Sequence, residues 1–463
     1  MAPTRRSTGR CDGHVKRCDE DVPERYSFAL GGGSAALAGA YSDGYTAMTS
    51  VDTDTSLTAD TTDTQLAFHW FLPTQGDGRR LIEEARPLGV AGRPRPASLG
   101  YLTQVALAAE ELGFDGALTP TGLWCDDAWV TTAMLSQRTE RLKFMIAFRP
   151  GMVSPTLAAQ MAATFQRHSR GRLLLNVVTG GDAEEQRALG DSLEKTGRYA
   201  RTAEFLRIVR DLWRGETVNL DGEHVTVEGA HLEQLPPSPP PVYFGGSSAA
   251  ALGVAARHVD VYLSWGEPPA PLREKLETVS ELAAAEGRRL RLGIRLHVVC
   301  RDNARDAWRE AERLLEGIHP TTIEQVQERL RRSESEGQRR MLALHNGSAS
   351  SLEVAPNLWA GVGLARGGAG TALVGSHEEV ADRIAEYAEL GISEFVLSGY
   401  PHLEEAYWFA EGVLPILAER GLASTPGSAP SSTVEDPRAR GAAATATGRA
   451  SVPFAGVAGA NGR

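Results

Sequence analysis

Short apolar runs alternate with longer amphipathic stretches between Gln65 and Leu422, and this pattern predicts repeated strand–helix units. The run 173–178 is apolar at nearly every position. Both faces of such a strand must be buried, as in a parallel sheet that is covered by helices. The predicted strands are 66–72, 115–119, 142–147, 172–177, 241–244, 259–264, 291–299 and 394–398.

The stretches between these strands have the spacing of amphipathic helices, with apolar residues three and four positions apart. One such face is formed by Tyr101, Val105, Ala108, Ala109 and Leu112, and another by Ala203, Leu206, Val209 and Leu212. Gly113, Gly171 and Gly391 follow predicted helices, where a left-handed cap suits glycine. Eight strand–helix units in about 350 residues predict a (β/α)₈ TIM barrel, an α/β fold, rather than an open doubly wound sheet.

A barrel of this kind needs only about 250 residues, so insertions are expected, and two are visible. The first is a hairpin at 217–233 with an Asp-Gly turn. The second runs from 301 to 375, before the last strand, and holds two predicted helices, 304–315 and 322–332, and a glycine-rich stretch. Because this excursion starts at the C-terminal face of the barrel, it is a candidate lid over the site.

The two ends of the chain differ in composition from its middle. Residues 1–64 combine charged and Thr/Asp/Ser-rich runs, and residues 423–463 are rich in Ala, Gly, Ser, Thr and Pro. Neither end has enough large apolar side chains to offset the entropy of ordering a chain. We therefore expect one folded domain at 65–422 between two disordered extensions.

Charge and cysteine content argue against several classes of function. Lys and Arg number 48 and Asp and Glu 59, which leaves a net charge of −11. Binding to nucleic acid or to an anionic membrane would need a basic surface. The sequence has no run of 18 apolar residues, no export signal of the usual form and only four cysteines, so we expect a cytoplasmic protein without a disulfide scaffold.

In a barrel the active site lies at the C-terminal ends of the strands, so polar residues at those ends are candidates. Gly245-Gly246-Ser247-Ser248 follow a predicted strand and open a helix, where amide and hydroxyl groups could hold a phosphate. A serine that only caps the helix is the alternative. No Walker motif or complete dinucleotide fingerprint is present, so neither a triphosphate nor a dinucleotide is supported as ligand.

Arg295 and His297 lie two positions apart on one predicted strand, so they share a face that points into the barrel or its mouth. An arginine there needs either a buried carboxylate or an anionic ligand. For His297, a core histidine with satisfied hydrogen bonds is the alternative. Arg366 lies in the glycine-rich stretch, where it could close on an anion, and a solvated surface side chain is the alternative.

Tyr400 and His402 come directly after the last predicted strand and carry groups that transfer protons, although aromatic packing would explain them as well. Cys125 is predicted to begin a helix, which lowers a thiol pKa, whereas the adjacent Asp126 and Asp127 raise it. We favour a role for Cys125 in tuning polarity or contacting a cofactor over covalent attack, and a simply buried thiol is the alternative. No histidines and carboxylates have the spacing of a metal site, so no metal is assigned.

Eight segments carry a resemblance to one enzyme family. They are FHWFLPTQGDG (68–78), NVVTG (176–180), YFGGSS (243–248), WGEPP (265–269), GIRLH (293–297), NLWAGVGL (357–364), RGGAGTALVG (366–375) and SGYPHLEE (398–405). Together they resemble the flavin-dependent alkanesulfonate monooxygenases of the bacterial luciferase-like superfamily, from residue 68 to residue 417.

The resemblance implies a TIM barrel that receives reduced FMN (FMNH2) from a separate NAD(P)H-dependent FMN reductase. It implies that reduced FMN and O2 react with an alkanesulfonate to give an aldehyde, sulfite, FMN and water, in the service of sulfur scavenging. It also implies a homotetramer.

Matched position by position, the resemblance implies functional roles for Cys125, Trp265, Arg295, His297, Arg366, Tyr400 and His402, and flavin-binding roles for Asn176, Thr179, Tyr199, Gly246, Ser247 and Ser248. A sulfonate is a permanent anion, which planar arginine side chains bind best, and Arg295 and Arg366 are the candidate pair. A closing Arg366 would also keep water from the reacting flavin. Which of His297, Tyr400 and His402 acts as the base stays open.

The chain departs from the usual pattern beside Cys125, where Leu123 and Trp124 stand in place of a common Arg-Ser pair and predict a narrower or more apolar pocket. Two other functions stay open. One is a related flavin monooxygenase that acts on a sulfone, an aminopolycarboxylate or a hydrocarbon. The other is a flavin-binding protein without turnover.

Overall fold

Eight parallel strands close into a barrel at the centre of the computed structural model, which describes residues 65–81 and 95–424. Around the barrel the strands are β1 (Ala67–Phe71), β2 (Gly116–Thr119), β3 (Lys143–Phe148), β4 (Leu173–Val177), β7 (Val242–Phe244), β8 (Val261–Trp265), β9 (Arg291–Arg301) and β13 (Ile392–Ser398). Pairing of β8 and β13 with β9 closes the ring. The predicted TIM barrel is confirmed, and each predicted strand lies within two residues of its observed ends.

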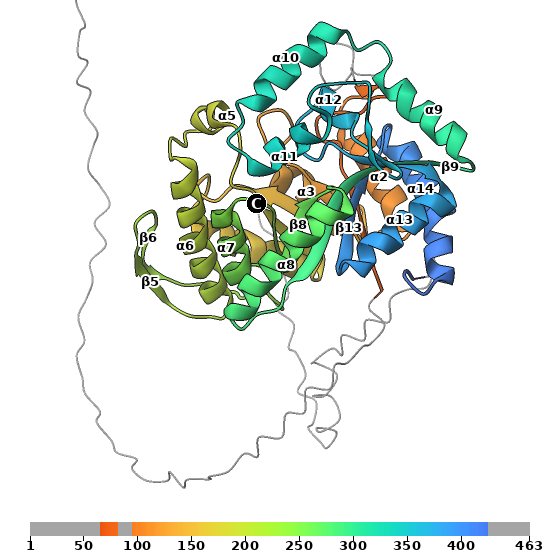
Figure 1. The fold of residues 1–463 in the computed structure, drawn as a ribbon. Helices are drawn as coiled ribbons and strands as arrows, with labels where there is room; N and C mark the ends of the chain where they lie inside the picture. Colours follow the sequence, from red (N-terminus) through yellow and green to blue (C-terminus); the bar gives the residue numbers. More distant parts are fainter. Residues whose placement is uncertain (1–64, 82–94, 425–463) are drawn as a thin grey trace, which may run out of the picture. The chain divides into compact units, whose positions relative to one another are not determined.

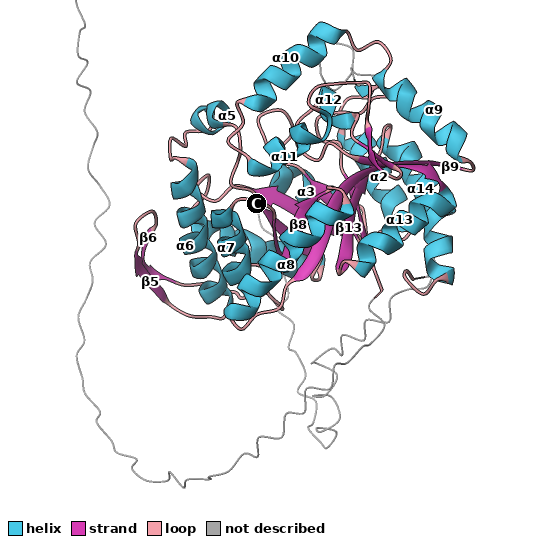
Figure 2. Cartoon of the chain, viewed as in Figure 1, coloured by secondary structure: helices cyan, strands magenta, loops and turns pink. Residues whose placement is uncertain are grey.

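Helices follow the strands and cover the outside of the barrel, as Figure 2 shows. They are α2 (Leu99–Glu111), α3 (Ala128–Leu135), α4 (Pro155–Ser169), α5 (Ala183–Ala188), α6 (Lys195–Trp213), α7 (Ala249–His258), α8 (Pro269–Ala285), α13 (His377–Glu389) and α14 (His402–Glu419). Gly113, Gly171 and Gly391 have positive φ angles of 88°, 84° and 91°, so the predicted left-handed helix ends are confirmed. None of the helices in the described part of the chain has the length and apolar character that a membrane span requires.

The inside of the barrel is filled by side chains rather than by a channel. One layer consists of Phe71, Leu118, Met145, Leu174, Tyr243, Val261, Leu263 and Val396. Below it, at the N-terminal end of the strands, the buried carboxylate of Glu394 accepts hydrogen bonds from Tyr243, at 2.5 Å, and from Arg291, and it lies 3.0 Å from Nε2 of His69. The barrel is therefore closed at its base, and a ligand can enter only from the other end.

Both predicted insertions are present, and the second contains more structure than its sequence pattern predicts. The first is the hairpin of β5 (Val218–Asp221) and β6 (Thr226–Ala230). In the second, α9 (Ala304–Leu315) and α10 (Pro320–Arg331) match the predicted helices. The remainder is α11 (Glu336–His345), β10 (Glu353–Ala355), β11 (Leu358–Trp359), α12 (Val362–Ala365) and β12 (Ala372–Ser376), which the sequence analysis missed.

The strand β12 ties this insertion to the barrel. It pairs in parallel with β9, from Ala372 opposite His297 to Ser376 opposite Arg301. The first half of β9 pairs with the barrel strands β8 and β13, and its second half extends past the barrel to meet β12. In Figure 1 the insertion helices α9, α10, α11 and α12 gather at one end of the barrel.

The two ends of the described fold meet at the base of the barrel. The amide of Leu66, just before β1, donates a hydrogen bond to the carbonyl of Leu422, at 2.8 Å. The hydroxyl of Ser424 also bonds to the side chain of Gln65. The first and last described segments are thus joined on the side away from the C-terminal ends of the strands.

Candidate active site

A chain of hydrogen bonds links Arg295 and His297 at the mouth of the barrel. Arg295 donates to the hydroxyl of Ser398 at 2.7 Å, and that oxygen lies 2.7 Å from Nδ1 of His297. Since the serine oxygen accepts from arginine, its proton goes to Nδ1. Nε2 of His297 then carries the other proton, which it donates to the carbonyl of Ala369 at 3.1 Å. Both ring nitrogens of His297 are therefore engaged, and the imidazole holds the glycine-rich stretch against β9.

Arg366 and Tyr400 complete a cationic cluster around this imidazole. Arg366 ends α12 and donates to the hydroxyl of Tyr400 at 2.6 Å. The ring of Tyr400 stacks on that of His297, with centroids 5.4 Å apart. Burial lowers the pKa of His297 well below its ordinary value, and the positive charges of Arg295 and Arg366 lower it further. His297 is accordingly neutral at physiological pH.

His402 lies beside this cluster, paired with an aspartate. Its Nδ1 is 2.9 Å from one oxygen of Asp77, and its backbone amide donates to the other oxygen at 2.8 Å. Tyr101 donates to the same carboxylate. Burial alone would raise the pKa of Asp77, but the charge and hydrogen bonds of His402, with the bond from Tyr101, bring it below its ordinary value. Asp77 therefore stays ionised.

Packing joins the two halves of the cluster. The guanidinium of Arg295 lies over the ring of Phe71, 5.0 Å from its centroid, and the ring of His402 lies 5.5 Å from that of Phe71. Tyr400 meets His402 edge to face at 5.2 Å. The structure thus brings together five of the residues singled out in the sequence: Arg295, His297, Arg366, Tyr400 and His402.

Trp265 belongs to the same mouth, on the neighbouring strand. It is the last residue of β8 and lies in register with Arg295 of β9. A Cβ placed on Gly337 of α11 would lie 3.2 Å from the indole, so the insertion packs directly on this ring. Trp265 is therefore one of the contacts between the barrel mouth and α11, beside the ion pair of Glu267 with Arg340.

The prediction that Cys125 begins a helix is wrong. Helix α3 begins at Ala128, and the side chain of Asp127 caps it by accepting a hydrogen bond from the amide of Val130 at 2.8 Å. The side chain of Asp127 is the one that reaches this free amide, and aspartate is a strongly preferred N-cap residue. Cys125 lies in the preceding turn, where its Sγ is 3.5 Å from the carbonyl of Gly122.

We expect Cys125→Ser to retain most of the activity, because the thiol is poorly suited to covalent attack. Burial raises the pKa of Cys125 to about 11, and the carboxylates of Glu185 and Asp126 contribute to this. A thiol with such a pKa is almost entirely protonated at neutral pH. The rate of iodoacetamide labelling should keep rising up to pH 10, and fast labelling at pH 7 would contradict this picture. Cys300 is fully buried and provides the unreactive internal control.

The glycine turn between β7 and α7 has the form of an anion cradle. A Cβ on Gly245 would lie 2.6 Å from the carbonyl oxygen of Leu263, so only glycine fits there. Ser248 caps α7 by accepting a hydrogen bond from the amide of Ala251, at 3.3 Å. The hydroxyl of Tyr199 lies 3.6 Å from a Cβ built on Gly246. The plain helix cap is thus present, and phosphate binding by Gly246, Ser247, Ser248 and Tyr199 stays a prediction.

Asn176 lies on the next strand around the mouth, β4, and Thr179 lies in the loop that follows it. Asn176 is in register with Tyr243 of β7 and shares the inward face of β4 with Leu174. The carbonyl of Thr179 accepts hydrogen bonds from Gln186, at 3.3 Å, and Arg198, at 3.1 Å. The predicted flavin-binding residues therefore line the β4–β7 side of the mouth, across from the cationic cluster on β9 and β13.

In the described part of the chain, several buried polar atoms at the mouth have no hydrogen-bond partner, and two of them fit a bound cofactor or substrate. Among the residues that the structure describes, Nε2 of His402 and the hydroxyl of Thr119, at the end of β2, have no hydrogen-bond partner. Buried polar atoms are normally paired, so a ligand is the natural partner. Within the same residues, no group of His, Cys, Asp and Glu lies close enough together to hold a metal ion.

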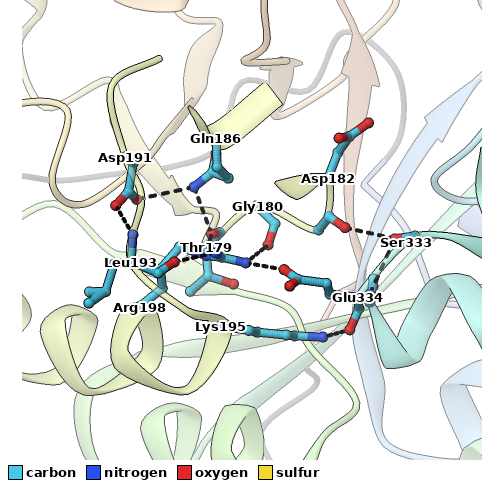
Figure 3. Close-up of polar contacts among 12 residues, drawn as sticks. Thr179, Gly180, Asp182, Gln186, Asp191, Leu193, Lys195, Arg198, Ser333 and Glu334 are labelled. Atoms are coloured by element: carbon cyan, nitrogen blue, oxygen red, sulfur yellow. Dashed lines mark hydrogen bonds and ion pairs between the residues drawn. The ribbon is translucent and has the colours of Figure 1, made fainter. Parts of the chain in front are cut away.

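The insertion is fastened over the mouth by the short segment between α10 and α11. Figure 3 shows the contacts. Glu334 donates its amide to the carbonyl of Gly181 at 3.0 Å, and Ser333 donates its hydroxyl to the same oxygen at 2.9 Å. The carboxylate of Glu334 accepts from the buried Arg198 at 2.6 Å, and its carbonyl accepts from Lys195. We call Glu334 and Arg198 the latch pair.

We expect Glu334→Gln to loosen the insertion, because the neutral amide replaces a charge-assisted bond to Arg198. Hydrogen exchange in 332–336 should speed up, and kcat/KM should fall about tenfold if closure is needed for turnover. The control is Glu336→Gln, which removes an ion pair with the exposed Arg339 and leaves the latch pair intact. Unchanged exchange in the Glu334 variant would show that the latch pair does not hold the segment.

Three polar residues of the site escaped the sequence analysis. Ser398 connects the arginine and histidine of β9, Asp77 orients His402, and Glu334 fastens the insertion. Two features of the sequence could have pointed to Asp77 and Ser398. Asp77 and Ser398 both lie inside the segments that carry the resemblance, and Ser398 ends a predicted strand, where site residues are expected. Glu334 had no signal, because it lies in a charged stretch between two surface helices.

Two cavities of the described residues lie away from this cluster. One, of about 560 Å³, lies between α10 and α11 and is lined by Glu334, Glu336 and Arg339 among others. The other, of about 280 Å³, lies beside α13 and is lined by Pro268, Leu373 and Tyr387 among others. Neither cavity is lined by residues of the cationic cluster, where the chemistry-bearing groups converge, so we place the site by those groups and not by these cavities.

Comparison with known proteins agrees with this architecture. Residues 66–394 match the family described as luciferase-like monooxygenase. A riboflavin lyase structure with modified FMN and riboflavin is 22% identical, covers 79% of this chain and 94% of its own, and has a TM-score of 0.67. EDTA monooxygenase from Chelativorans sp. BNC1 is 19% identical over 77% and 94% of the two chains, with a TM-score of 0.63. A long-chain alkane monooxygenase is 20% identical over 78% and 92%, with a TM-score of 0.59. At these identities the solved structures show the shared fold, and because the family match covers well over half of the chain, the protein belongs to the luciferase-like monooxygenase family.

Proposed function

We propose that this protein is a two-component, FMNH2-dependent monooxygenase that desulfonates alkanesulfonates. In this proposal a separate NAD(P)H-dependent reductase supplies the reduced FMN, and O2 is the co-substrate. The products are an aldehyde, sulfite, FMN and water. We also propose that the protein is a homotetramer and is located in the cytoplasm.

The observation that carries it is the convergence of two arginines on one small neutral centre. Arg295 and Arg366 come from elements 71 positions apart in sequence, and both act electrostatically on His297. Two guanidinium groups that act on the same neutral imidazole give this part of the mouth a positive potential, which favours an anionic substrate. A sulfonate keeps its charge at every useful pH, and planar arginine side chains match its oxygens.

The geometry supports different roles for different residues of the mouth. The β4–β7 side, with the glycine turn and Tyr199, would hold the FMN phosphate, and the bound flavin would supply the activation of O2. Arg295 and Arg366 would bind and orient the sulfonate. His297 would keep the Arg366 segment in place through the carbonyl of Ala369. The insertion, fastened by the latch pair, would exclude water from the reacting groups.

Sulfite release tests the proposal. Purified protein is mixed with a flavin reductase, NADPH, FMN, air and a series of short to long alkanesulfonates. Sulfite that depends on every component is the expected result, and the series also ranks the chain lengths. Absence of sulfite with every alkanesulfonate, under conditions in which reduced flavin binds, would refute the proposed substrate class.

A second candidate is an aminopolycarboxylate such as EDTA. The structural likeness to an EDTA monooxygenase favours it, and paired arginines bind carboxylates as well as sulfonates. The same assay, with EDTA in place of the alkanesulfonate and with aldehyde rather than sulfite as the readout, separates the two substrates.

A further inference from the structure

The proposed reaction requires a base at the carbon that carries the sulfonate. That carbon has two hydrogens in the alkanesulfonate and one in the aldehyde. Balanced, one alkanesulfonate anion, O2 and FMNH2 give the aldehyde, a sulfite dianion, FMN, water and one proton. The C–S bond breaks with its electron pair on sulfite, and the C–H pair stays with carbon to form the C=O bond. One proton is thus left for the protein to accept.

The three candidate bases are His297, Tyr400 and His402. Of these, only His402 has a nitrogen that is available to accept a proton. Both nitrogens of His297 are occupied, by Ser398 and by the carbonyl of Ala369. The hydroxyl oxygen of Tyr400 already accepts a hydrogen bond from Arg366, and a neutral phenol is a far weaker base than an imidazole. Within residues 65–81 and 95–424, Nε2 of the fully buried His402 is without a hydrogen-bond partner, although Nδ1 is held.

Asp77 decides which nitrogen of His402 carries the proton. An ionised carboxylate can only accept hydrogen bonds, so Nδ1, 2.9 Å from Asp77, must be the donor. In the neutral imidazole, Nε2 is then left with a lone pair. Asp77 itself is fixed by the amides of Gly78 and His402 and by the hydroxyl of Tyr101. Such a carboxylate also stabilises the imidazolium that forms when Nε2 takes up a proton.

We infer that Asp77 is a positioning residue that holds His402 in the tautomer whose Nε2 accepts the proton lost from the substrate carbon. The inference rests on the proposed function for the identity of the proton donor, and on the geometry alone for the tautomer. After proton transfer, His402 is an imidazolium paired with the Asp77 carboxylate. It returns its proton to solvent before the next turnover.

The first test reads the tautomer directly and needs no turnover. Protein labelled with ¹⁵N-histidine is examined by two-bond ¹H–¹⁵N correlation, and the signals of His402 are assigned by their loss in His402→Gln. The expected pattern is a protonated Nδ1 and an unprotonated Nε2 in the wild type. Asp77→Asn should move the proton to Nε2 in a large fraction of molecules, because the introduced amide can donate to Nδ1. A proton on Nε2 in the wild type would overturn the inference.

The second test measures the rate of turnover and the kinetic isotope effect. Asp77→Asn should lower kcat about 10²-fold with little change in KM, the size of effect expected for losing a positioned base. The kinetic isotope effect with an alkanesulfonate deuterated at the sulfonate-bearing carbon should increase, since proton removal becomes slower. Unchanged kcat and isotope effect would overturn the role. Because Asp77→Asn could also fold poorly, Tyr101→Phe serves as a milder variant that keeps the carboxylate, with an expected fall in kcat of a few-fold.

Glu394→Gln is the matched control. It also alters a buried histidine–carboxylate pair, with His69, but at the opposite end of the barrel. Measured per folded molecule, it should leave the His402 tautomer and the isotope effect unchanged. An equal loss of kcat in this variant would show that Asp77 acts through general stability. If the wild type releases no sulfite from any alkanesulfonate, the proposed function fails, while the NMR result still decides whether Asp77 fixes the tautomer.

Discussion

Replacing Arg366 with alanine is expected to lower kcat/KM for an alkanesulfonate about 10³-fold while reduced FMN still binds. Truncating one partner of a desolvated charge pair typically costs about 2–5 kcal/mol, and each 1.4 kcal/mol is a factor of about ten. Arg366 lies on the insertion side of the mouth, away from the glycine turn that is expected to hold the flavin. Substrate recognition should therefore fail without loss of the cofactor.

Two further variants define what Arg366 contributes. Arg366→Lys should recover only part of the activity, because an ammonium cannot make two parallel bonds to one anion. Arg309→Ala is the control, since Arg309 is 71% exposed on α9 and pairs only locally with Asp306. Steady-state kinetics and quenching of protein fluorescence by FMNH2 under anaerobic conditions give the two readouts. An Arg366→Ala enzyme with normal kcat/KM would remove the sulfonate-binding role.

Glu394→Ala is expected to destabilise the folded protein by about 3–5 kcal/mol at pH 7, the usual result of removing one partner from a buried ionic network. His69, Tyr243 and Arg291 all direct polar atoms at this carboxylate from three strands of the barrel. Without the carboxylate, the buried His69 and Tyr243 lose their acceptor at the base of the barrel, and the half-exposed Arg291 loses its ion pair. Urea unfolding followed by circular dichroism measures the difference.

The same carboxylate should make stability depend on pH. Burial alone would raise the pKa of Glu394, but the bonds and charges of His69, Arg291 and Tyr243 bring it below its ordinary value. A lowered pKa means that the unfolded chain binds the proton first as pH falls. The contribution is therefore complete above the unfolded pKa of about 4.3 and is lost as pH falls through the folded pKa. The stability gap between wild type and Glu394→Ala should narrow below pH 4, and a constant gap down to pH 3 would contradict this assignment.

The barrel could be predicted from the sequence because each strand is a local apolar run of its own. The sequence also predicted correctly that Arg295 and His297 lie on the same face of one strand. Side chains alternate between the two faces of a strand, so residues two positions apart share a face whatever the rest of the chain does. The contact between Arg366 and Tyr400 could not be predicted from the pattern, because it depends on how the insertion folds back. That path is set by β12, whose partner is the half of β9 that extends beyond the barrel.

The first residue of α3 is another feature that the sequence analysis did not predict correctly. The sequence analysis predicted that the helix begins at Cys125, two residues before Asp127. The structure starts the helix after Asp127, since an aspartate side chain can accept the orphan amide of Val130. Moving the start by three residues changes the chemistry of Cys125, because the thiol then lies outside the field of the helix N-terminus.

The hydrogen bond between Leu66 and Leu422 holds the two ends of the described fold next to each other. Because the two ends lie close together, a circular permutation is feasible: a short linker would join them, and new ends would be made in a surface loop. The same strands would remain neighbours in the barrel. The junction lies at the base, away from the mouth. Whatever polypeptide is attached at either point, natural or engineered, is therefore tethered to the end of the barrel that takes no part in catalysis.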